Sequence, residues 1–340
     1  MKLAIVGFRH GHVGAIYQKA QELDFVEIVA CVEEDPAARE AIPRDLGVTL
    51  THASFDEVLD SVEFDALACV DYYAKRGPLV IRALEAGKHV VTDKPLCTEI
   101  DQLQTIARLS RERDLIVHVD LTMRYSPGAC TVQRLVSAGA IGELATATIF
   151  GQHPLAWGSR PHWYFEPGKH RGTLNDIMIH GLDMLRWATG REFTCVLAAA
   201  ASGLADSPAP PHFQHSAQCF MELAGGARVF GDSSYLAPAG HHAPWRFFLW
   251  GSQGHLSWEL GGDVELQRAG EPVDVGGLAF LGGETPTCPM ADPFEDFARQ
   301  VEFGAAPFLD REACLRSSMA ALAAQKAADT GQRDLPVEAV

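Results

Sequence analysis

The chain has 340 residues, of which 47% are hydrophobic and 21% charged, as in ordinary globular proteins. Its formal net charge of −16 argues against nucleic acid and anionic membranes as partners. The eight cysteines form no C-x-x-C pair, and no signal peptide or membrane-spanning stretch is recognisable, so we expect reduced thiols and a cytoplasmic location.

The first third of the chain alternates short apolar runs with segments of helical periodicity. We expect strands at 3–6, 27–32, 66–70, 89–92 and 115–119, and helices at 13–22, 36–42, 55–59, 78–86 and 100–111. Apolar strands that are joined by helices form parallel sheets with both faces covered. The pattern therefore predicts an α/β fold with a doubly wound parallel sheet.

The pattern changes after residue 122. We expect strands at 144–151, 195–200, 216–223, 227–235, 246–250, 255–259 and 264–268, helices at 129–138, 173–188, 293–303 and 311–330, and loops at 202–215, 237–244 and 276–292. Glycine-containing turns between the strands are typical of hairpins. We therefore expect two domains, residues 1–122 and 123–340. The second is an α/β domain with a large, mostly antiparallel open sheet, and the closing helix packs back on the first.

The first expected strand ends at Gly7. A strand, a glycine turn and a helix begin a dinucleotide site, whose G-x-G-x-x-G pattern lets the backbone approach a pyrophosphate. Only the first glycine is present, because Arg9 and His12 occupy the other two positions. The turn is either a modified dinucleotide turn or the location of a metal-binding pair, His10 and His12.

An acidic residue follows the second expected strand. Glu33 stands where a carboxylate accepts hydrogen bonds from the ribose hydroxyls of a dinucleotide. It would also repel a 2′-phosphate, so it favours NAD over NADP. The strand, the turn and the acid together favour the dinucleotide interpretation.

Two further segments carry candidate catalytic residues. Lys94 precedes Pro95 at the end of a buried strand, at the edge where open α/β sheets bind ligands. Asp176, His180 and Asp183 are spaced to share one face of the expected helix 173–188. Such a polar stripe is costly to bury without a function, although a solvent-facing stripe is the alternative.

Together these motifs resemble the Gfo/Idh/MocA oxidoreductases, named after glucose–fructose oxidoreductase and inositol 2-dehydrogenase. The family's E-K-P motif resembles Asp93-Lys94-Pro95, its D-x-x-x-H motif resembles Asp176 to His180, and its interdomain crossover resembles Arg124 to Pro127. The resemblance implies a Rossmann domain, a nicotinamide cofactor, and sugar, polyol or related hydroxylated substrates. It also implies a homodimer or homotetramer that forms through the C-terminal sheet.

These expectations assign roles to individual residues. In the oxidation of an alcohol, His180 is the expected base, Lys94 donates to the reacting oxygen, and Asp176 orients the base or binds a neighbouring hydroxyl. The expected cofactor contacts are Gly7, Phe8, Arg9, His10, Glu33, Asp71, Tyr72, Asp93 and Lys94, and the expected substrate contacts are Arg124, Tyr125, Trp163, Asp176 and His180. Packing between the domains is the alternative for Arg124 and Tyr125, and no resident metal ion is expected.

The sequence also departs from the family pattern. Segment 70–78 lacks the usual T-P-x-x-x-H stretch, and 169–173 lacks the usual glycine run. Three alternatives stay open: a metal hydrolase of the amidohydrolase type, a redox-neutral enzyme that uses tightly bound NAD for transient oxidation, and a non-catalytic ligand sensor. The antiparallel pattern after residue 140 disfavours an eight-stranded hydrolase barrel, and the complete catalytic set disfavours a sensor.

Overall fold

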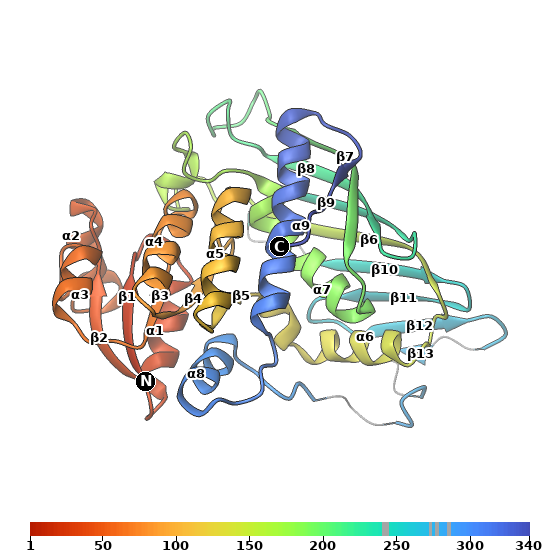
Figure 1. Cartoon of the computed structure of the whole chain (residues 1–340). Coiled ribbons are helices and arrows are strands. Elements are labelled where there is room, and N and C mark those ends of the chain that lie inside the picture. Colours follow the sequence, from red (N-terminus) through yellow and green to blue (C-terminus); the bar gives the residue numbers. More distant parts are fainter. Residues whose placement is uncertain (240–244, 272–273, 276–278, 284–286) are drawn as a thin grey trace.

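The computed structural model describes residues 1–239, 245–271, 274–275, 279–283 and 287–340, so parts of the expected loops 237–244 and 276–292 lie outside the described residues. Two sheets form its frame (Figure 1). The first has the strand order β2-β1-β3-β4-β5 and parallel neighbours throughout. The second has the order β13-β12-β11-β10-β6-β9-β8-β7-β14, and its described strands pair antiparallel except for β6 and β9. The predicted fold class is therefore confirmed.

The first sheet is a doubly wound Rossmann sheet. Its strands are β1 (Lys2–Val6), β2 (Glu27–Val32), β3 (Ala66–Cys69), β4 (His89–Asp93) and β5 (Val117–Asp120), and its helices are α1 (Val13–Glu22), α2 (Pro36–Leu46), α3 (Phe55–Ser61), α4 (Tyr73–Glu85) and α5 (Ile100–Glu112). The chain winds from β1 to β2 on one side and continues at β3 on the other. The carboxyl ends of β1 and β3 therefore border the crevice in which such sheets bind ligands.

The second sheet follows a short connection, η1 (Thr122–Tyr125) and α6 (Pro127–Ser137). Its strands are β6 (Leu144–Pro154), β7 (Phe193–Ser202), β8 (Ser216–Leu223), β9 (Arg228–Ala237), β10 (Arg246–Gly251), β11 (Gly254–Glu259), β12 (Val264–Arg268), β13 (Asp274–Val275) and β14 (Leu335–Pro336). Helices α6, α7 (Ile179–Thr189) and α9 (Arg311–Thr330) pack on one face. The opposite face exposes Phe220, Phe230 and Trp250.

Helix α9 lies between the two sheets, as Figure 1 illustrates. It packs on α5 and β5 on one side and on α7 and β7 on the other. The backbone N–H of Val119 in β5 donates to Sγ of Cys314 in α9. Helix α8 (Pro293–Phe303) packs on α1, β4 and β5 and adds Phe294 and Phe297 to their apolar cluster. Because α8 and α9, from the C-terminal part of the chain, pack on the first sheet, the division into two domains between residues 122 and 123 stays a proposal.

Helix α4 begins five residues before its predicted start. Proline is favoured in a first helical turn, so Pro78 predicts a start there, but the helix runs from Tyr73 with Pro78 inside it. The helix loses one backbone hydrogen bond at Pro78. In return, Tyr73 and Arg76 lie in the first turns of α4 and reach groups at the sheet's edge.

The predicted helix 173–188 is not regular. It starts with a π-helical turn, Leu174–Met178, and continues as α7. A π turn holds more residues than an α turn, so it rotates the side chains on either side of it relative to each other. Asp183 consequently accepts hydrogen bonds from Arg124 and Ser317, whereas Asp176 faces Lys94. Asp176 and Asp183 thus have separate sets of hydrogen-bond partners.

No helix in the part of the chain that the structure describes has both the length and the apolar character needed to cross a membrane.

Candidate functional site

Gly7 ends β1 at the carboxyl edge of the first sheet. Its φ of 82° lies in the region that favours glycine. A Cβ at this position would lie 2.6 Å from the backbone nitrogen of Asp71, which follows β3. The chain then passes through Arg9 and His10 into α1. The first glycine of the turn is therefore required here, although the other two are replaced.

We expect Gly7→Ala to lower the free energy of unfolding by about 2 kcal/mol or more. The positive φ costs an alanine roughly 1 kcal/mol, and the overlap with Asp71 adds on the order of 1–3 kcal/mol. Gly11→Ala is the matched control, because no neighbouring atom lies within 4 Å of a Cβ there. Urea denaturation compares the two variants, and equal unfolding midpoints would contradict the requirement at Gly7.

Glu33 lies beside this turn at the end of β2, as predicted. Its Oε2 accepts the backbone N–H of Phe8 at 2.8 Å, and its Oε1 accepts that of Asp35 at 2.8 Å. Burial raises the pKa of Glu33, and these two hydrogen bonds oppose the rise. The guanidinium of Arg9 lies 3.3 Å from Asp35 and 3.9 Å from Glu33. The turn and the acid thus form one unit.

Asp71 and Tyr72 follow β3 next to the turn. The Nζ of Lys75 lies 2.9 Å from Asp71, and the Nζ of Lys169 lies 5.0 Å from the centre of the Tyr72 ring. The structure therefore places seven of the nine predicted cofactor residues at the ends of β1, β2 and β3, and the other two, Asp93 and Lys94, at the end of β4.

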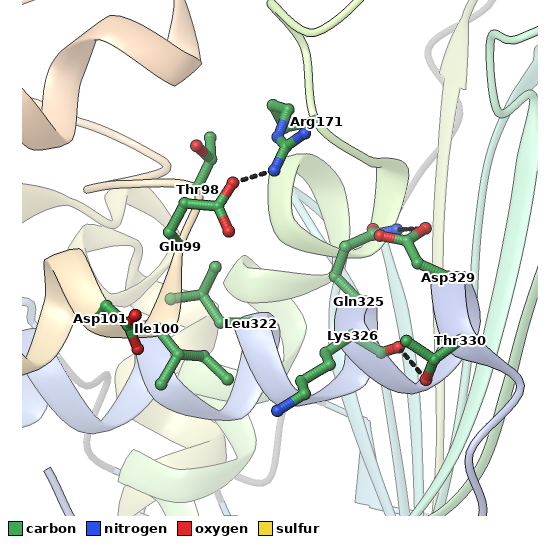
Figure 2. Close-up of a pocket in the computed structure, with 10 residues that line it drawn as sticks. All are labelled: Thr98, Glu99, Ile100, Asp101, Arg171, Leu322, Gln325, Lys326, Asp329 and Thr330. Carbon is green, nitrogen blue, oxygen red and sulfur yellow. Dashed lines mark hydrogen bonds and ion pairs between the residues drawn. The ribbon is translucent and has the colours of Figure 1, made fainter.

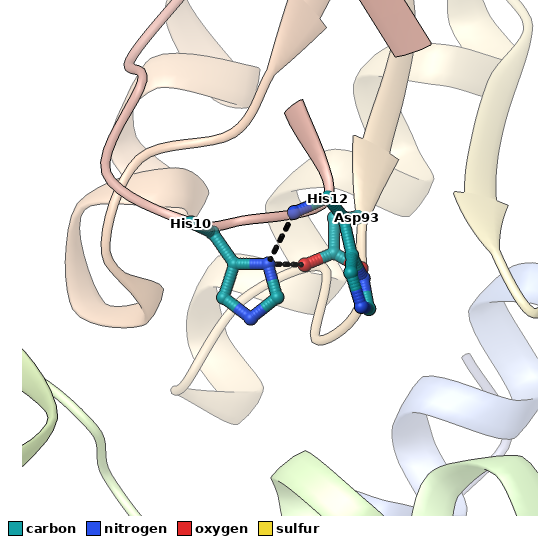
Figure 3. A group of neighbouring side chains, drawn as sticks. All are labelled: His10, His12 and Asp93. Carbon is teal, nitrogen blue, oxygen red and sulfur yellow. Dashed lines mark hydrogen bonds and ion pairs between the residues drawn. The ribbon is translucent and has the colours of Figure 1, made fainter. Parts of the chain in front are cut away.

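Asp93 ends β4 and gathers three basic side chains. Nη2 of Arg76 lies 3.0 Å from its Oδ2. Nδ1 of His10 lies 2.9 Å from the same oxygen, and Nδ1 of His12 lies 2.9 Å from Oδ1; Figure 3 draws these two histidines with Asp93. Burial alone would raise the pKa of Asp93, but His10, His12 and Arg76 outweigh it and hold the pKa well below its ordinary value. Asp93 is therefore a buried anion.

Lys94 points from the end of β4 to the π turn. Its Nζ lies 2.5 Å from Oδ1 and 3.0 Å from the backbone oxygen of Asp176. The Asp176 carboxylate also accepts from the hydroxyls of Tyr73 and Tyr235 and from Nε2 of His170 at 3.0 Å. Burial alone would raise the pKa of Asp176, but Lys94 and His170 hold it well below its ordinary value. Asp176 is thus a carboxylate ion with four donor side chains.

His180 lies on α7, just after the π turn. Its Nδ1 is buried and has no hydrogen-bond partner among the described residues. Burial lowers the pKa of His180 well below its ordinary value, and the positive charge of Lys94 lowers it further. The imidazole is therefore neutral at neutral pH, which is the form that accepts a proton.

Two titratable residues that the sequence analysis did not select lie in the same region. His153 is on β6. Burial is the main cause that lowers its pKa to about 4, and the positive charge of Lys94 lowers it further. Asp120 ends β5 and pairs in register with Asp93. Burial is the main cause that raises its pKa to about 7, and the negative charge of Asp93 also raises it. His153 lies among strand residues and Asp120 beyond the predicted strand end, so neither forms part of a local motif.

Three predicted substrate residues have other partners. Arg124 forms a two-pronged ion pair with Asp183 at 2.6 and 2.5 Å, and the Tyr125 hydroxyl donates to Asp296 at 2.9 Å. These contacts favour the interdomain-packing alternative for both residues. The indole N–H of Trp163 donates to the backbone oxygen of Arg9 at 2.7 Å, so Trp163 holds the glycine turn.

A cavity of about 300 Å³ opens between the start of α5 and α9 (Figure 2). Arg171 and Glu99 form an ion pair on its wall, and Lys326 and Asp329 line its other side. Its lining includes none of the predicted catalytic residues. This cavity is therefore separate from the predicted catalytic residues Lys94, Asp176 and His180.

The matches to family models cover most of the chain. Residues 1–121 match the model described as an oxidoreductase family with an NAD-binding Rossmann fold, and residues 129–257 match the GFO/IDH/MocA C-terminal domain. This chain belongs to the Gfo/Idh/MocA family. The resemblance that the motifs indicated is thereby confirmed.

Curated relatives of this Gfo/Idh/MocA protein include inositol dehydrogenases. It is 24% identical over 260 residues to inositol 2-dehydrogenase from Rhizobium meliloti, an alignment that covers 76% of each chain. It is 26% identical over 217 residues to scyllo-inositol 2-dehydrogenase (NAD(+)) from Bacillus subtilis, which covers 63% of this chain and 61% of the relative.

Solved structures share the fold over the whole chain. A levoglucosan dehydrogenase in complex with NADH superimposes with a TM-score of 0.79 at 18% identity and covers 100% of both chains. An aldose-aldose oxidoreductase from Caulobacter crescentus superimposes with a TM-score of 0.78 at 19% identity and covers 98% of this chain and 99% of its own. At these identities the likeness establishes the fold.

Proposed function

We propose that this chain is an NAD-dependent dehydrogenase that transfers hydride between a nicotinamide cofactor and a carbinol carbon of a sugar, polyol or related hydroxylated compound. The observation that carries the proposal is the buried ion pair of Lys94 and Asp176 next to the neutral His180. The relatives named for inositols and levoglucosan support this substrate class.

The residues at the carboxyl edge of the first sheet fit a dinucleotide. Gly7 provides the tight turn, and the N-terminus of α1 follows it, where pyrophosphates bind. Each carboxylate oxygen of Glu33 accepts one backbone N–H and keeps lone pairs for a ribose hydroxyl. A bound nicotinamide would accept or return the hydride.

The protein's own groups account for the proton and the charge on the alcohol oxygen. Neutral His180 takes the hydroxyl proton. Lys94 uses two N–H donors on Asp176 and has a third for the oxygen, where it stabilises negative charge as the bond breaks. Because four side chains already donate to Asp176, we assign it the task of holding Lys94, and not of binding a substrate hydroxyl.

Thermal-shift measurements with NAD and NADP, followed by a panel of polyols, sugars and sugar acids, test the proposal. Ligands that bind the native state raise the melting temperature by mass action. We expect a rise with a nicotinamide cofactor and NADH formation with at least one member of the panel. A cofactor that copurifies without net turnover would instead support the redox-neutral alternative, and no shift with either cofactor would overturn the proposal.

We expect Glu33→Gln to weaken NAD binding about tenfold and to raise the affinity for NADP relative to NAD. A charged acceptor contributes on the order of 1.5–3 kcal/mol to a hydrogen bond, and the charge that repels a 2′-phosphate is removed. Isothermal titration with both cofactors measures the two affinities. Glu34→Gln is the neighbouring control, because Glu34 pairs with Lys75 and does not bind the turn. An unchanged preference in Glu33→Gln would refute the assignment of NAD.

We also propose a cytoplasmic homo-oligomer that associates through the outer face of the second sheet. Phe220 pairs with Phe230 in register, and Thr148 separates Phe230 from Phe248 in the same row. Exposed aromatic side chains on one sheet face are typical of protein interfaces. None of the eight cysteines is in a disulfide, which supports a reducing compartment.

Light scattering is expected to give a dimer or tetramer for the native chain and monomers for Phe230→Glu. A charge in the centre of an apolar interface is desolvated without a partner, which costs several kcal/mol. Phe303→Glu is the matched control, because Phe303 is exposed on α8 and lies away from the sheet. If Phe230→Glu has the native mass, the interface lies elsewhere.

A further inference from the structure

Three potential metal ligands meet at the end of β4. One ring nitrogen each of His10 and His12 and a carboxylate oxygen of Asp93 all lie within 4.8 Å of one another (Figure 3). Each imidazole faces a different oxygen of the same carboxylate. Two imidazoles and one carboxylate form a donor set that suits Zn²⁺, Fe²⁺ or Co²⁺, whereas Mg²⁺ and Ca²⁺ prefer oxygen ligands.

The second neighbours of these ligands are also in place. Nε2 of His10 lies 2.7 Å from the hydroxyl of Tyr164, and Nη2 of Arg76 lies 3.0 Å from Oδ2 of Asp93. In metal sites, a ligating histidine donates its other ring N–H to an oxygen, and ligating carboxylates are hydrogen-bonded in turn. The orientation of His10 and Asp93 is therefore set by groups behind them.

A count of protons points to a further cation at His10. A chain of four contacts links Asp176 to Asp93. The hydroxyl of Tyr73 lies 2.7 Å from the Asp176 carboxylate and 2.6 Å from the hydroxyl of Tyr164. The Tyr164 hydroxyl lies 2.7 Å from Nε2 of His10, whose Nδ1 lies 2.9 Å from the Asp93 carboxylate. The two carboxylates only accept, and two tyrosines and a neutral imidazole supply three protons for the four contacts. A metal ion or one more proton at Nδ1 of His10 completes the chain. The backbone N–H of His12 donates to the same Nδ1 at 3.3 Å, and a protonated Nδ1 could not accept it, so the arrangement favours the metal ion.

Asp120 provides an independent observation. It is 8% exposed, and its Oδ1 is buried without a hydrogen-bond partner among the described residues. The register of β4 and β5 pairs it with Asp93, so two carboxylates lie side by side at the edge of the sheet. A divalent ion at this edge would offset the mutual repulsion of the two carboxylates.

We propose that His10, His12 and Asp93 bind a first-row divalent transition-metal ion next to Lys94. The sequence offered a metal-binding pair of His10 and His12 as one interpretation of the turn, without Asp93, and the final expectation was no resident metal ion. The His12 side chain is 50% exposed and gives the ion access from solvent, while His10 and Asp93 are buried. The site adjoins Lys94, the residue that follows Asp93. It stands apart from the dehydrogenase proposal, because its test needs neither cofactor nor substrate.

The test is a titration of the full chain, stripped with a chelator, with Zn²⁺ and with Co²⁺. We expect one ion per chain with a dissociation constant in the micromolar range or below, and a visible Co²⁺ absorption band of imidazole coordination. His12→Ala should weaken Zn²⁺ binding at least tenfold, and His12→Gln is the second variant if alanine disturbs folding. His162→Ala is the matched control, because that side chain is 88% exposed and outside the cluster.

Circular dichroism and melting temperature confirm that each variant is folded before titration. Mg²⁺ at the same concentrations serves as the control ion and is expected not to bind. The proposal is overturned if the stripped chain binds no stoichiometric Zn²⁺, which would leave a protonated His10 to complete the chain of contacts. It is equally overturned if His12→Ala and His162→Ala weaken binding alike, since binding would then be to scattered surface histidines.

Discussion

Lys94→Met is expected to lower kcat about 10²- to 10³-fold while the chain still folds and binds cofactor. A donor aimed at a developing negative charge contributes on the order of 3–4 kcal/mol to the transition state in a site from which water is excluded. The loss falls mainly on kcat, because the contact between the ammonium and the alcohol oxygen strengthens as the proton leaves. Steady-state kinetics with a substrate from the panel measure kcat and KM separately.

Lys326→Met is the matched control for this prediction. Lys326 is exposed on α9, so the same change there removes a charge without touching the reaction site. Thermal shift with NAD establishes that both variants bind cofactor. A Lys94→Met enzyme within threefold of the native kcat would remove Lys94 from the catalytic set and leave the dehydrogenase assignment without its main support.

The order of strands and helices could be predicted from local sequence patterns. The strands β1 and β3 are buried and form nearly continuous apolar runs in the sequence, and helices α2 and α3 begin after the capping residues Asp35 and Ser54. The start of α4 and the π turn could not be predicted from the sequence. In both places tertiary contacts, of Tyr73 with Asp176 and of Lys94 with Asp176, accompany a backbone that local preferences do not indicate.

The candidate site divides in the same way. Lys94, Asp176 and His180 carry motifs with fixed spacing and could be selected from the sequence. The side chains that hold Asp176 come from α4, β9 and the segment before the π turn, separated from it by 103, 59 and 6 residues. No periodicity links residues so far apart, so Tyr73 and Tyr235 could be identified only in the folded chain.

His12 illustrates a different limit. In the sequence His12 occupies a position where the dinucleotide pattern has glycine, so it was interpreted as the loss of a glycine. In the structure its imidazole faces Asp93, which itself stands where the family motif has glutamate. The two departures from the pattern are therefore neighbours in space.

Asp176→Asn is expected to lower the free energy of unfolding by roughly 3–5 kcal/mol at neutral pH and to reduce activity as strongly as the loss of Lys94. Removing one partner of a buried ion pair leaves the other charge uncompensated, and Lys94 is buried. The amide also has only one acceptor oxygen and brings an NH₂ group against the donors of Tyr73, Tyr235 and His170. Urea denaturation measures the loss.

Glu112→Gln is the control for this stability measurement. Glu112 forms an ion pair with Arg108 on the surface of α5, where such pairs contribute about 0–1 kcal/mol. If Asp176→Asn costs no more than Glu112→Gln, the pair of Lys94 and Asp176 does not hold the site together. The double variant Lys94→Met/Asp176→Asn gives the sharper comparison. Its loss should be smaller than the two single losses combined, because no uncompensated charge remains buried once both partners are neutral.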